Sequence, residues 1–270
     1  MTATTATTGT VASLSEEFVA AGVTAGRTVL VHTSMRAVGP VDGGVATVLA
    51  ALRRVIGRAA VVVSAQTPNN STSSPAFRAA TRGMTPAEVA GHIARIEGFD
   101  PATTPSFGVG VFAEHVRQDP EAVRSTHPQA SFAALGHGAA ELMRVHDLEC
   151  HLGERSPLGA LYEADATILL LGVGYGACTA FHLAEYRLPR RPTREYCCFL
   201  RDGDGDGDRR VRCDFTGLDL DDGDFEFLGR AMETSPDVVV TRGRVGRART
   251  LSMPMRRAVD FAVGWMARNR

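Results

Sequence analysis

The sequence predicts an α/β fold in which the loops that follow the strands gather at one edge of a sheet. Three runs carry this prediction: residues 28–32, 59–65 and 167–171 are apolar and rich in β-branched or aliphatic residues, as buried strands are. Each run leads into a polar or glycine-containing loop, and residues of helical character follow. Strand, loop and helix in succession are typical of an α/β sheet.

Capping patterns and apolar periodicity predict the elements around these strands. Ser13 and Glu16 form a capping-box pattern for a first helix, and Asp42 is placed to cap a helix over residues 44–56. A second capping box over residues 85–88 contains a first-turn proline. Further helices are expected over residues 109–117, 139–146, 222–232 and 254–268, and further strands over 195–200, 209–215 and 238–241.

Length, charge and cysteine content bound the class of protein. The chain has 270 residues, 44% of them hydrophobic, and a formal net charge of -1, which implies neither a general nucleic-acid partner nor a membrane partner. No apolar run approaches the roughly 18–20 residues that cross a bilayer. Five cysteines without a CxxC pair indicate reduced thiols in a cytoplasmic protein. We expect a disordered tail over residues 1–12 and a single domain over residues 13–270.

The most informative stretch is residues 167–186. Three glycines follow the strand at alternate positions, over residues 172–176, so the backbone can turn sharply and approach a ligand. His182 and Glu185 lie three residues apart in the helix that follows and therefore share one face. A carboxylate partner favours an imidazole as general base, so His182 and Glu185 are predicted to be catalytic.

Three other residues are candidates for a base or a nucleophile. His127 precedes Pro128, which places it in an irregular segment, and it is the second candidate catalytic histidine. Cys178 lies where a helix N-terminus can lower a thiol pKa, but the sequence places no histidine beside it, so a packing role is favoured. Ser34 lacks the G-x-S-x-G context of a hydrolase nucleophile.

Two motifs indicate ligands but lack a residue that the ligand needs. The glycines of residues 172–176 with Ala177 match the dinucleotide fingerprint G-x-G-x-x-A, yet the acid with the right spacing, Glu195, precedes the next strand instead of ending it. The Asp–Gly run over residues 202–208 resembles half of a calcium loop, but Cys213 stands where the bidentate glutamate belongs. We expect no bound metal, and a dinucleotide oxidoreductase is the less favoured alternative.

Several blocks of the sequence resemble the aminoglycoside 3-N-acetyltransferase family. They are V-H-x-S-x-x-x-V-G at 31–39, R-S-x-H-P at 124–128, S-x-A-A-x-G at 131–136, L-L-L-G at 169–172 and H-L-A-E at 182–185. The resemblance covers residues 29–226. It implies a mixed-sheet α/β sandwich, distinct from the small acetyltransferase superfamily, whose R/Q-x-x-G-x-G/A pyrophosphate loop this sequence lacks.

The resemblance also implies a reaction, which is transfer of an acetyl group from acetyl-coenzyme A to the 3-amino group of a 2-deoxystreptamine aminoglycoside, a resistance activity. Direct attack is expected, because no activated nucleophile is evident. Backbone amides of residues 34–39 are the expected oxyanion donors. The family allows a homodimer. The coenzyme site is expected at His32, Thr33, Ser34, Met35, Arg36, Val38, Gly39 and Ser106, and the substrate site at Asn69, Tyr175 and Asp224.

Two departures from the family pattern leave alternatives open. Gly176 stands where many members have an acid, and Cys178 stands where they have an asparagine. The alternatives are acetylation of a different small amine and a non-catalytic member that binds coenzyme A or an amine.

Overall fold

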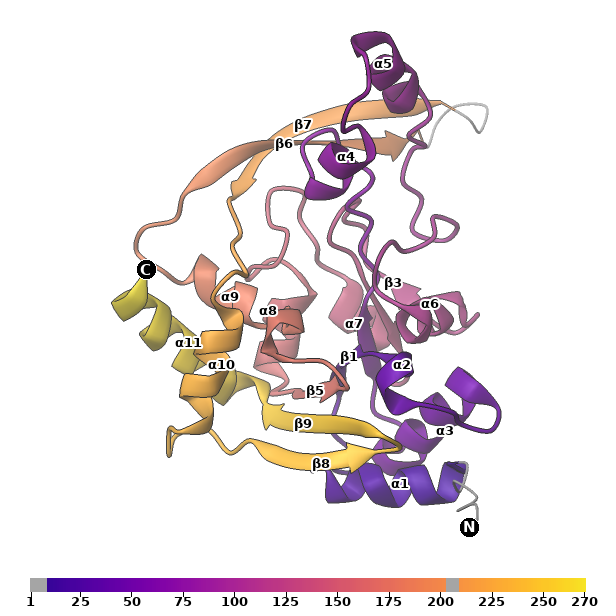
Figure 1. The fold of residues 1–270 in the computed structure, drawn as a ribbon, viewed down its shortest axis with the longest axis vertical. Coiled ribbons are helices and arrows are strands. Elements are labelled where there is room, and N and C mark those ends of the chain that lie inside the picture. Colours follow the sequence, from indigo (N-terminus) through magenta and orange to yellow (C-terminus); the bar gives the residue numbers. More distant parts are fainter. Residues whose placement is uncertain (1–8, 203–208) are drawn as a thin grey trace, which may run out of the picture.

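The computed structural model describes residues 9–202 and 209–270, and its centre is a mixed sheet. Within these residues the sheet has seven strands in the order β3-β4-β2-β1-β5-β9-β8 (Figure 1). β1 (Val29–Thr33) pairs in parallel with β2 (Val61–Ser64) and β5 (Thr167–Leu171). The remaining strands pair antiparallel: β3 (Val123–Arg124), β4 (Phe132–Leu135), β8 (Thr241–Val245) and β9 (Ala248–Pro254).

Helices cover both faces of this sheet. Val29 and Val31 of β1 belong to one apolar core and Leu30 to the other, as the period of two along a strand requires. The first core includes α1 (Val11–Ala20), α3 (Gly44–Ile56) and α6 (Val111–Gln118). The second includes α7 (Ala139–Met143), α8 (Pro157–Glu163), α9 (Phe181–Tyr186), α10 (Phe225–Glu233) and α11 (Met255–Asn269). The predicted mixed-sheet α/β sandwich is confirmed.

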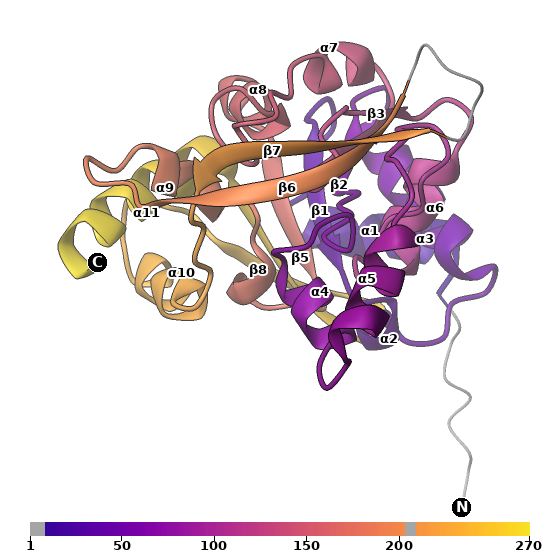
Figure 2. The ribbon, with the colours of Figure 1, turned by 90° about the horizontal axis from the view of Figure 1, so that it is seen from above.

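A two-stranded ribbon of β6 (Thr193–Arg201) and β7 (Arg210–Leu218) runs across the molecule from α9 towards α5 (Figures 1 and 2). Asn70 fastens it to the main body: its side-chain amide donates to the Phe199 carbonyl at 3.0 Å, and its side-chain oxygen accepts from the Phe199 amide at 2.8 Å. At the far end, Arg210 donates to the carbonyls of Ile93 and Ile96. Ile93 lies in α5 (Pro86–Ala94), which follows α4 (Pro75–Ala80) along the chain.

Two predicted helix caps are wrong. Thr10 caps α1, with reciprocal bonds between Thr10 and Ser13, because serine supplies the acceptor that was assigned to Glu16. Ordered structure therefore begins before residue 13, while residues 1–8 lie outside the described residues. α3 follows Gly43, which is left-handed at φ 73° and has no side-chain cap, so Asp42 plays no such role. The capping box of Thr85 is confirmed.

Short elements escaped prediction. β4 reads F-A-A-L, which lacks the β-branched residues that mark strands, although it is buried on both faces. The strand predicted over residues 238–241 begins only at Thr241, and the central strand β9 was not predicted. α4 and α8 also went unpredicted. The calcium-loop-like run falls mainly on residues 203–208, outside the described residues. None of the helices described is both long and apolar enough to cross a bilayer.

Candidate active site

The carboxyl ends of three parallel strands meet around a pocket of about 320 Å³. His32 and Thr33 end β1, Ser64 ends β2, and residues 173–179 follow β5. Because β2, β1 and β5 are parallel neighbours, their ends share one edge of the sheet, where α/β folds bind ligands. Asp222 and Phe225 close the pocket from the side of α10.

His182 lines this pocket and is oriented by Glu185. Its Nδ1 lies 2.6 Å from Glu185 Oε2, and the exposed fractions of the two side chains are 13% and 5%. A carboxylate oxygen accepts, so Nδ1 carries the proton in this bond and Nε2 keeps its lone pair. When the ring is neutral, this tautomer presents a bare Nε2 that can accept a proton.

Arg270 holds the carboxylate behind the histidine. Its Nη1 lies 2.5 Å from Glu185 Oε1, which also accepts from the Asp221 amide at 3.0 Å. The same guanidinium bonds both carboxylate oxygens of Asp224, at 2.5 and 2.8 Å. The hydrogen-bonded carboxylate of Asp224, followed by that of Glu185, raises the pKa of Arg270. These bonds of Arg270 join α9, the start of α10 and the end of α11. No sequence motif indicated them.

Comparison with known proteins decides the family. The model of the aminoglycoside 3-N-acetyltransferase family matches residues 30–267. The chain belongs to the aminoglycoside 3-N-acetyltransferase family. Among curated relatives, the SPbeta prophage-derived aminoglycoside N(3')-acetyltransferase-like protein YokD of Bacillus subtilis (strain 168) is 33% identical over 95% of this chain and 92% of its own. Aminoglycoside N(3)-acetyltransferase VII of Streptomyces paromomycinus is 34% identical over 94% and 90%.

Solved structures of aminoglycoside acetyltransferases share the fold over nearly the whole chain. The crystal structure of YokD from Bacillus subtilis superposes with a TM-score of 0.88 at 31% identity, covering 97% of this chain and 94% of that one. A binary complex of AAC-IIIb with CoASH gives 0.83 at 25% identity, covering 97% and 98%. AAC-VIa bound to sisomicin gives 0.79 at 26% identity, covering 98% and 99%.

His127 lies in a buried cluster outside the pocket. Its Nδ1 accepts from the amides of Gln129 and Ala130 at 3.0 and 3.1 Å, and its Nε2 donates to the Leu148 carbonyl at 3.0 Å. Burial, and then the neighbouring His151, holds the pKa of His127 well below its usual value. Both ring nitrogens are engaged, so this geometry gives His127 a structural place and leaves it no nitrogen for catalysis.

Arg124, which opens the same R-S-x-H-P block, ties together the loops around the pocket. Its guanidinium donates to the Ser131 hydroxyl at 3.0 Å, to the Ala65 carbonyl at 2.5 Å and to the Thr104 carbonyl. A planar fork with several donors suits three acceptors on separate segments. Arg124 of the R-S-x-H-P block therefore holds three separate segments together beside the pocket.

The segment predicted to bind the coenzyme is a short helix instead of a loop. Ser34 caps α2 (Met35–Val38) by accepting from the Ala37 amide at 3.3 Å. The amides of Met35 and Arg36 have no intramolecular acceptor among the described residues. The amides that do have acceptors, and so cannot serve as free oxyanion donors, are those of Ser34, Ala37, Val38 and Gly39.

The other predicted coenzyme residues occupy different places. His32 and Thr33 line the pocket together with His182. Val38 is 1% exposed and packs in the core. Ser106 is fixed by Glu114 Oε2, which accepts from its amide at 3.0 Å and from its hydroxyl at 2.5 Å.

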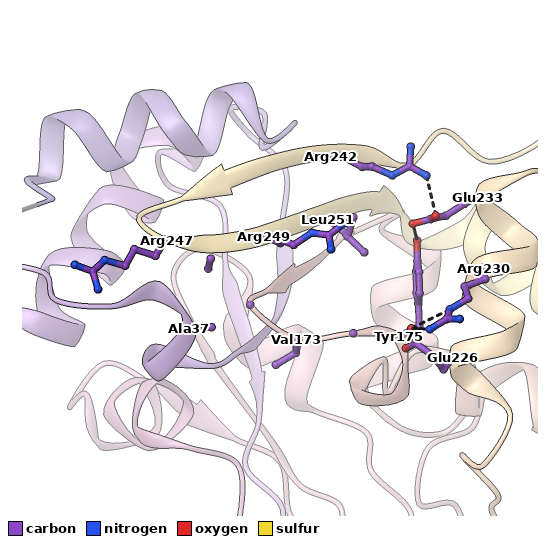
Figure 3. Close-up of a pocket in the computed structure, with 13 residues that line it drawn as sticks. Ala37, Val173, Tyr175, Glu226, Arg230, Glu233, Arg242, Arg247, Arg249 and Leu251 are labelled. Atoms are coloured by element: carbon purple, nitrogen blue, oxygen red, sulfur yellow. Dashed lines mark hydrogen bonds and ion pairs between the residues drawn. The ribbon is translucent and has the colours of Figure 1, made fainter. Parts of the chain in front are cut away.

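Tyr175 lies in a second pocket, of about 590 Å³, on the other side of the glycine turn (Figure 3). Its hydroxyl donates to Glu233 at 2.8 Å, and burial together with this carboxylate raises its pKa. Four arginines and two glutamates line this pocket, a balance that suits an anion better than a polycation. Asn69 lines a third pocket, of about 420 Å³. None of the predicted substrate residues lines the pocket of His182.

The glycine turn is a poor dinucleotide site. A Cβ at Gly174 would lie 2.8 Å from Glu226 Oε2, and the Gly176 amide approaches the same oxygen at 3.4 Å. A carboxylate thus stands where a pyrophosphate would need to bind. After β5 and α9 the chain enters the ribbon instead of a neighbouring parallel strand, so the βαβ unit is incomplete. Burial raises the pKa of Cys178 to about 12, which disfavours its thiolate.

Proposed function

We propose that this protein transfers the acetyl group of acetyl-coenzyme A to the 3-amino group of a 2-deoxystreptamine aminoglycoside, with His182 as general base. The observation that carries the proposal is the 2.6 Å bond between His182 Nδ1 and Glu185, which leaves Nε2 bare in a pocket at the carboxyl edge of the sheet. Related proteins are named for this activity, and a neighbour structure holds CoASH.

The reaction is a direct attack. The amine nitrogen forms a bond to the thioester carbonyl carbon while His182 Nε2 takes the proton that the amine loses. The carbonyl oxygen becomes negative in the tetrahedral intermediate and needs hydrogen-bond donors. The C–S bond then breaks, the carbonyl reforms, and the proton leaves with the thiol of coenzyme A. Glu185 keeps the imidazole in the required tautomer throughout.

The coenzyme is proposed to lie along α2, with its thioester in the pocket of His182. The amides of Met35 and Arg36 are free to donate to the coenzyme, and the Arg36 side chain is exposed. Ser106, held by Glu114, is proposed to border the coenzyme from the opposite loop. The five cysteines are all free thiols, which supports a cytoplasmic location, where glutathione keeps thiols reduced.

The amine substrate needs carboxylates, and we propose Asp222 as the first of them. It lines the pocket of His182, is exposed and has no ion-pair partner among the described residues. Asp224, favoured by the sequence, would have to give up its bonds to Arg270 before it could bind a cation. Asn69 lines the pocket of about 420 Å³, and we propose that another ring of a multi-ring substrate reaches it.

The test is release of thiol from acetyl-coenzyme A in the presence of a panel of aminoglycosides and simpler amines. The sequence contains no lysine, so acetylated lysine of the enzyme itself cannot account for the product. We expect thiol release to match N-acetylated aminoglycoside, identified by mass spectrometry. Release with simpler amines alone would favour the other-amine alternative. Saturable binding of both ligands without turnover would favour the non-catalytic one.

A further inference from the structure

We infer that His32 Nε2 is a hydrogen-bond donor that stabilises the negative oxygen of the tetrahedral intermediate. The inference rests on the proposed acyl transfer and assigns a side chain to a role that the geometry denies to most of the amides of residues 34–39. The side chain of His32, near the end of β1, carries it.

His32 Nε2 is buried and has no hydrogen-bond partner among the described residues. His32 is 8% exposed, and its Nε2 is one of the few buried side-chain polar atoms of these residues left unpaired. Leaving such an atom unsatisfied is destabilising, so native proteins seldom do so without a reason. Because His32 lines the pocket of His182, a ligand in that pocket would supply the missing acceptor. Thr33 Oγ1 is also unpaired, but Thr33 is the next residue of the strand and points to the opposite face of the sheet, so it does not serve the same oxygen.

The position of His32 fits the reacting carbonyl better than the amine. The amine proton already has an acceptor in His182, which lines the same pocket. The carbonyl oxygen needs donors, and a neutral imidazole N–H is a donor. The amides of residues 34 and 37–39 are already bonded, so a side chain is needed beside the two free amides of residues 35 and 36.

The protonation state of His32 supports this role. Burial, and then the neighbouring His182, lowers the pKa of His32 to about 4. The ring therefore stays neutral at working pH and does not compete with His182 for the amine proton. A neutral donor fixed in a buried site needs no reorganisation when charge develops, which is how an oxyanion hole works.

Paired substitutions separate catalysis from structure. His32→Leu should lower kcat by about 10²–10³-fold, as the loss of one oxyanion donor does, with KM for acetyl-coenzyme A within threefold of wild type. Its melting temperature should not fall, because the change removes an unsatisfied buried nitrogen. His32→Gln restores a donor and should regain at least tenfold over leucine.

Two results would overturn the inference. One is a folded His32→Leu protein with kcat within threefold of wild type, or with a loss that glutamine does not repair. The other result needs no turnover and comes from NMR of protein with ¹⁵N-labelled histidine. If His32 donates through Nε2, its ring must be the neutral Nε2–H tautomer from pH 5.5 to 8. An Nδ1–H tautomer, or protonation of the ring within that pH range, would overturn the inference, whether or not any amine is acetylated. Inert amines with the Nε2–H tautomer would instead count against the proposed substrate alone.

Discussion

Acidification should unfold this protein through a buried histidine cluster beneath the ribbon. The ring centroid of His127 lies 4.8 Å from that of His146 and 4.6 Å from that of His151, and all three residues are at least nine-tenths buried. Burial is the first cause that lowers the pKa of His146 to about 4 and of His151 to about 3, and it acts on His127 in the same direction. His146, then Arg194 and His182, lower the pKa of His151 further, while the bond to the His151 carbonyl and then Asp147 oppose the shift of His146.

The sign follows from proton binding. An unfolded histidine takes up a proton near pH 6.5, while the folded ring stays neutral until its lowered pKa, so stability falls as pH drops below about 6.5. For His146 the loss should be about 2 kcal/mol at pH 5 and about 3 kcal/mol by pH 4, at about 1.4 kcal/mol per pKa unit. His146 and His151 together would lose roughly 4 kcal/mol at pH 5, and His127 shifts in the same direction, so the loss approaches the whole stability of a typical domain.

The assay is urea unfolding between pH 7.5 and pH 5, followed by circular dichroism. The free energy of unfolding should fall with a limiting slope of about 4 kcal/mol per pH unit, for three protons. His146→Gln cannot take up a proton, so its slope should be about one third smaller. His137→Gln, at an exposed histidine, is the matched control and should keep the full slope. A free energy that stays flat from pH 7.5 to pH 5, or an unchanged slope in His146→Gln, would refute the reasoning.

Three further outcomes are expected. Arg270→Met should lower kcat about tenfold or more and shift the acidic limb of the pH–rate profile, because Glu185 loses the cation that holds it; an unchanged profile would leave Arg270 a purely structural role. Asn70→Ala should cost about 2–4 kcal/mol in urea unfolding, because several buried backbone groups lose their partner, whereas Asn69→Ala, at an exposed site, should cost less than about 0.5 kcal/mol; equal costs would contradict this. Acetyl-coenzyme A should raise the melting temperature and NADP should not, and a shift with NADP alone would remove the transferase proposal.

Local signals made part of the fold and site predictable. The three parallel strands are apolar runs bounded by polar or glycine residues. Such runs are typical of buried strands whatever the topology of the sheet. The i, i+3 spacing of His182 and Glu185 lies within one helical turn, so a side-chain bond between them depends on little else. The family resemblance added that the sheet is mixed, but it did not locate the antiparallel strands β4 and β9.

Other features depend on contacts between distant segments. Arg270 reaches Glu185 across 85 residues, and no spacing rule connects them. His127 and His182 each belong to a block that resembles the family, yet the first has both ring nitrogens hydrogen-bonded in a buried cluster and the second lines a pocket. Asp224 belongs to an acidic run that could bind a cation, but the fold supplies that cation internally as Arg270.

The central claim is that His182 Nε2 removes the proton of the attacking amine. The direct measurement is single-turnover acetyl transfer by His182→Ala, with circular dichroism to confirm folding and coenzyme A binding measured separately. The account predicts a rate about 10²–10⁴-fold below wild type, the usual worth of general acid–base catalysis, with coenzyme A affinity little changed and a smaller loss in Glu185→Gln. Near-normal turnover by a well-folded His182→Ala protein would contradict it and place the base elsewhere.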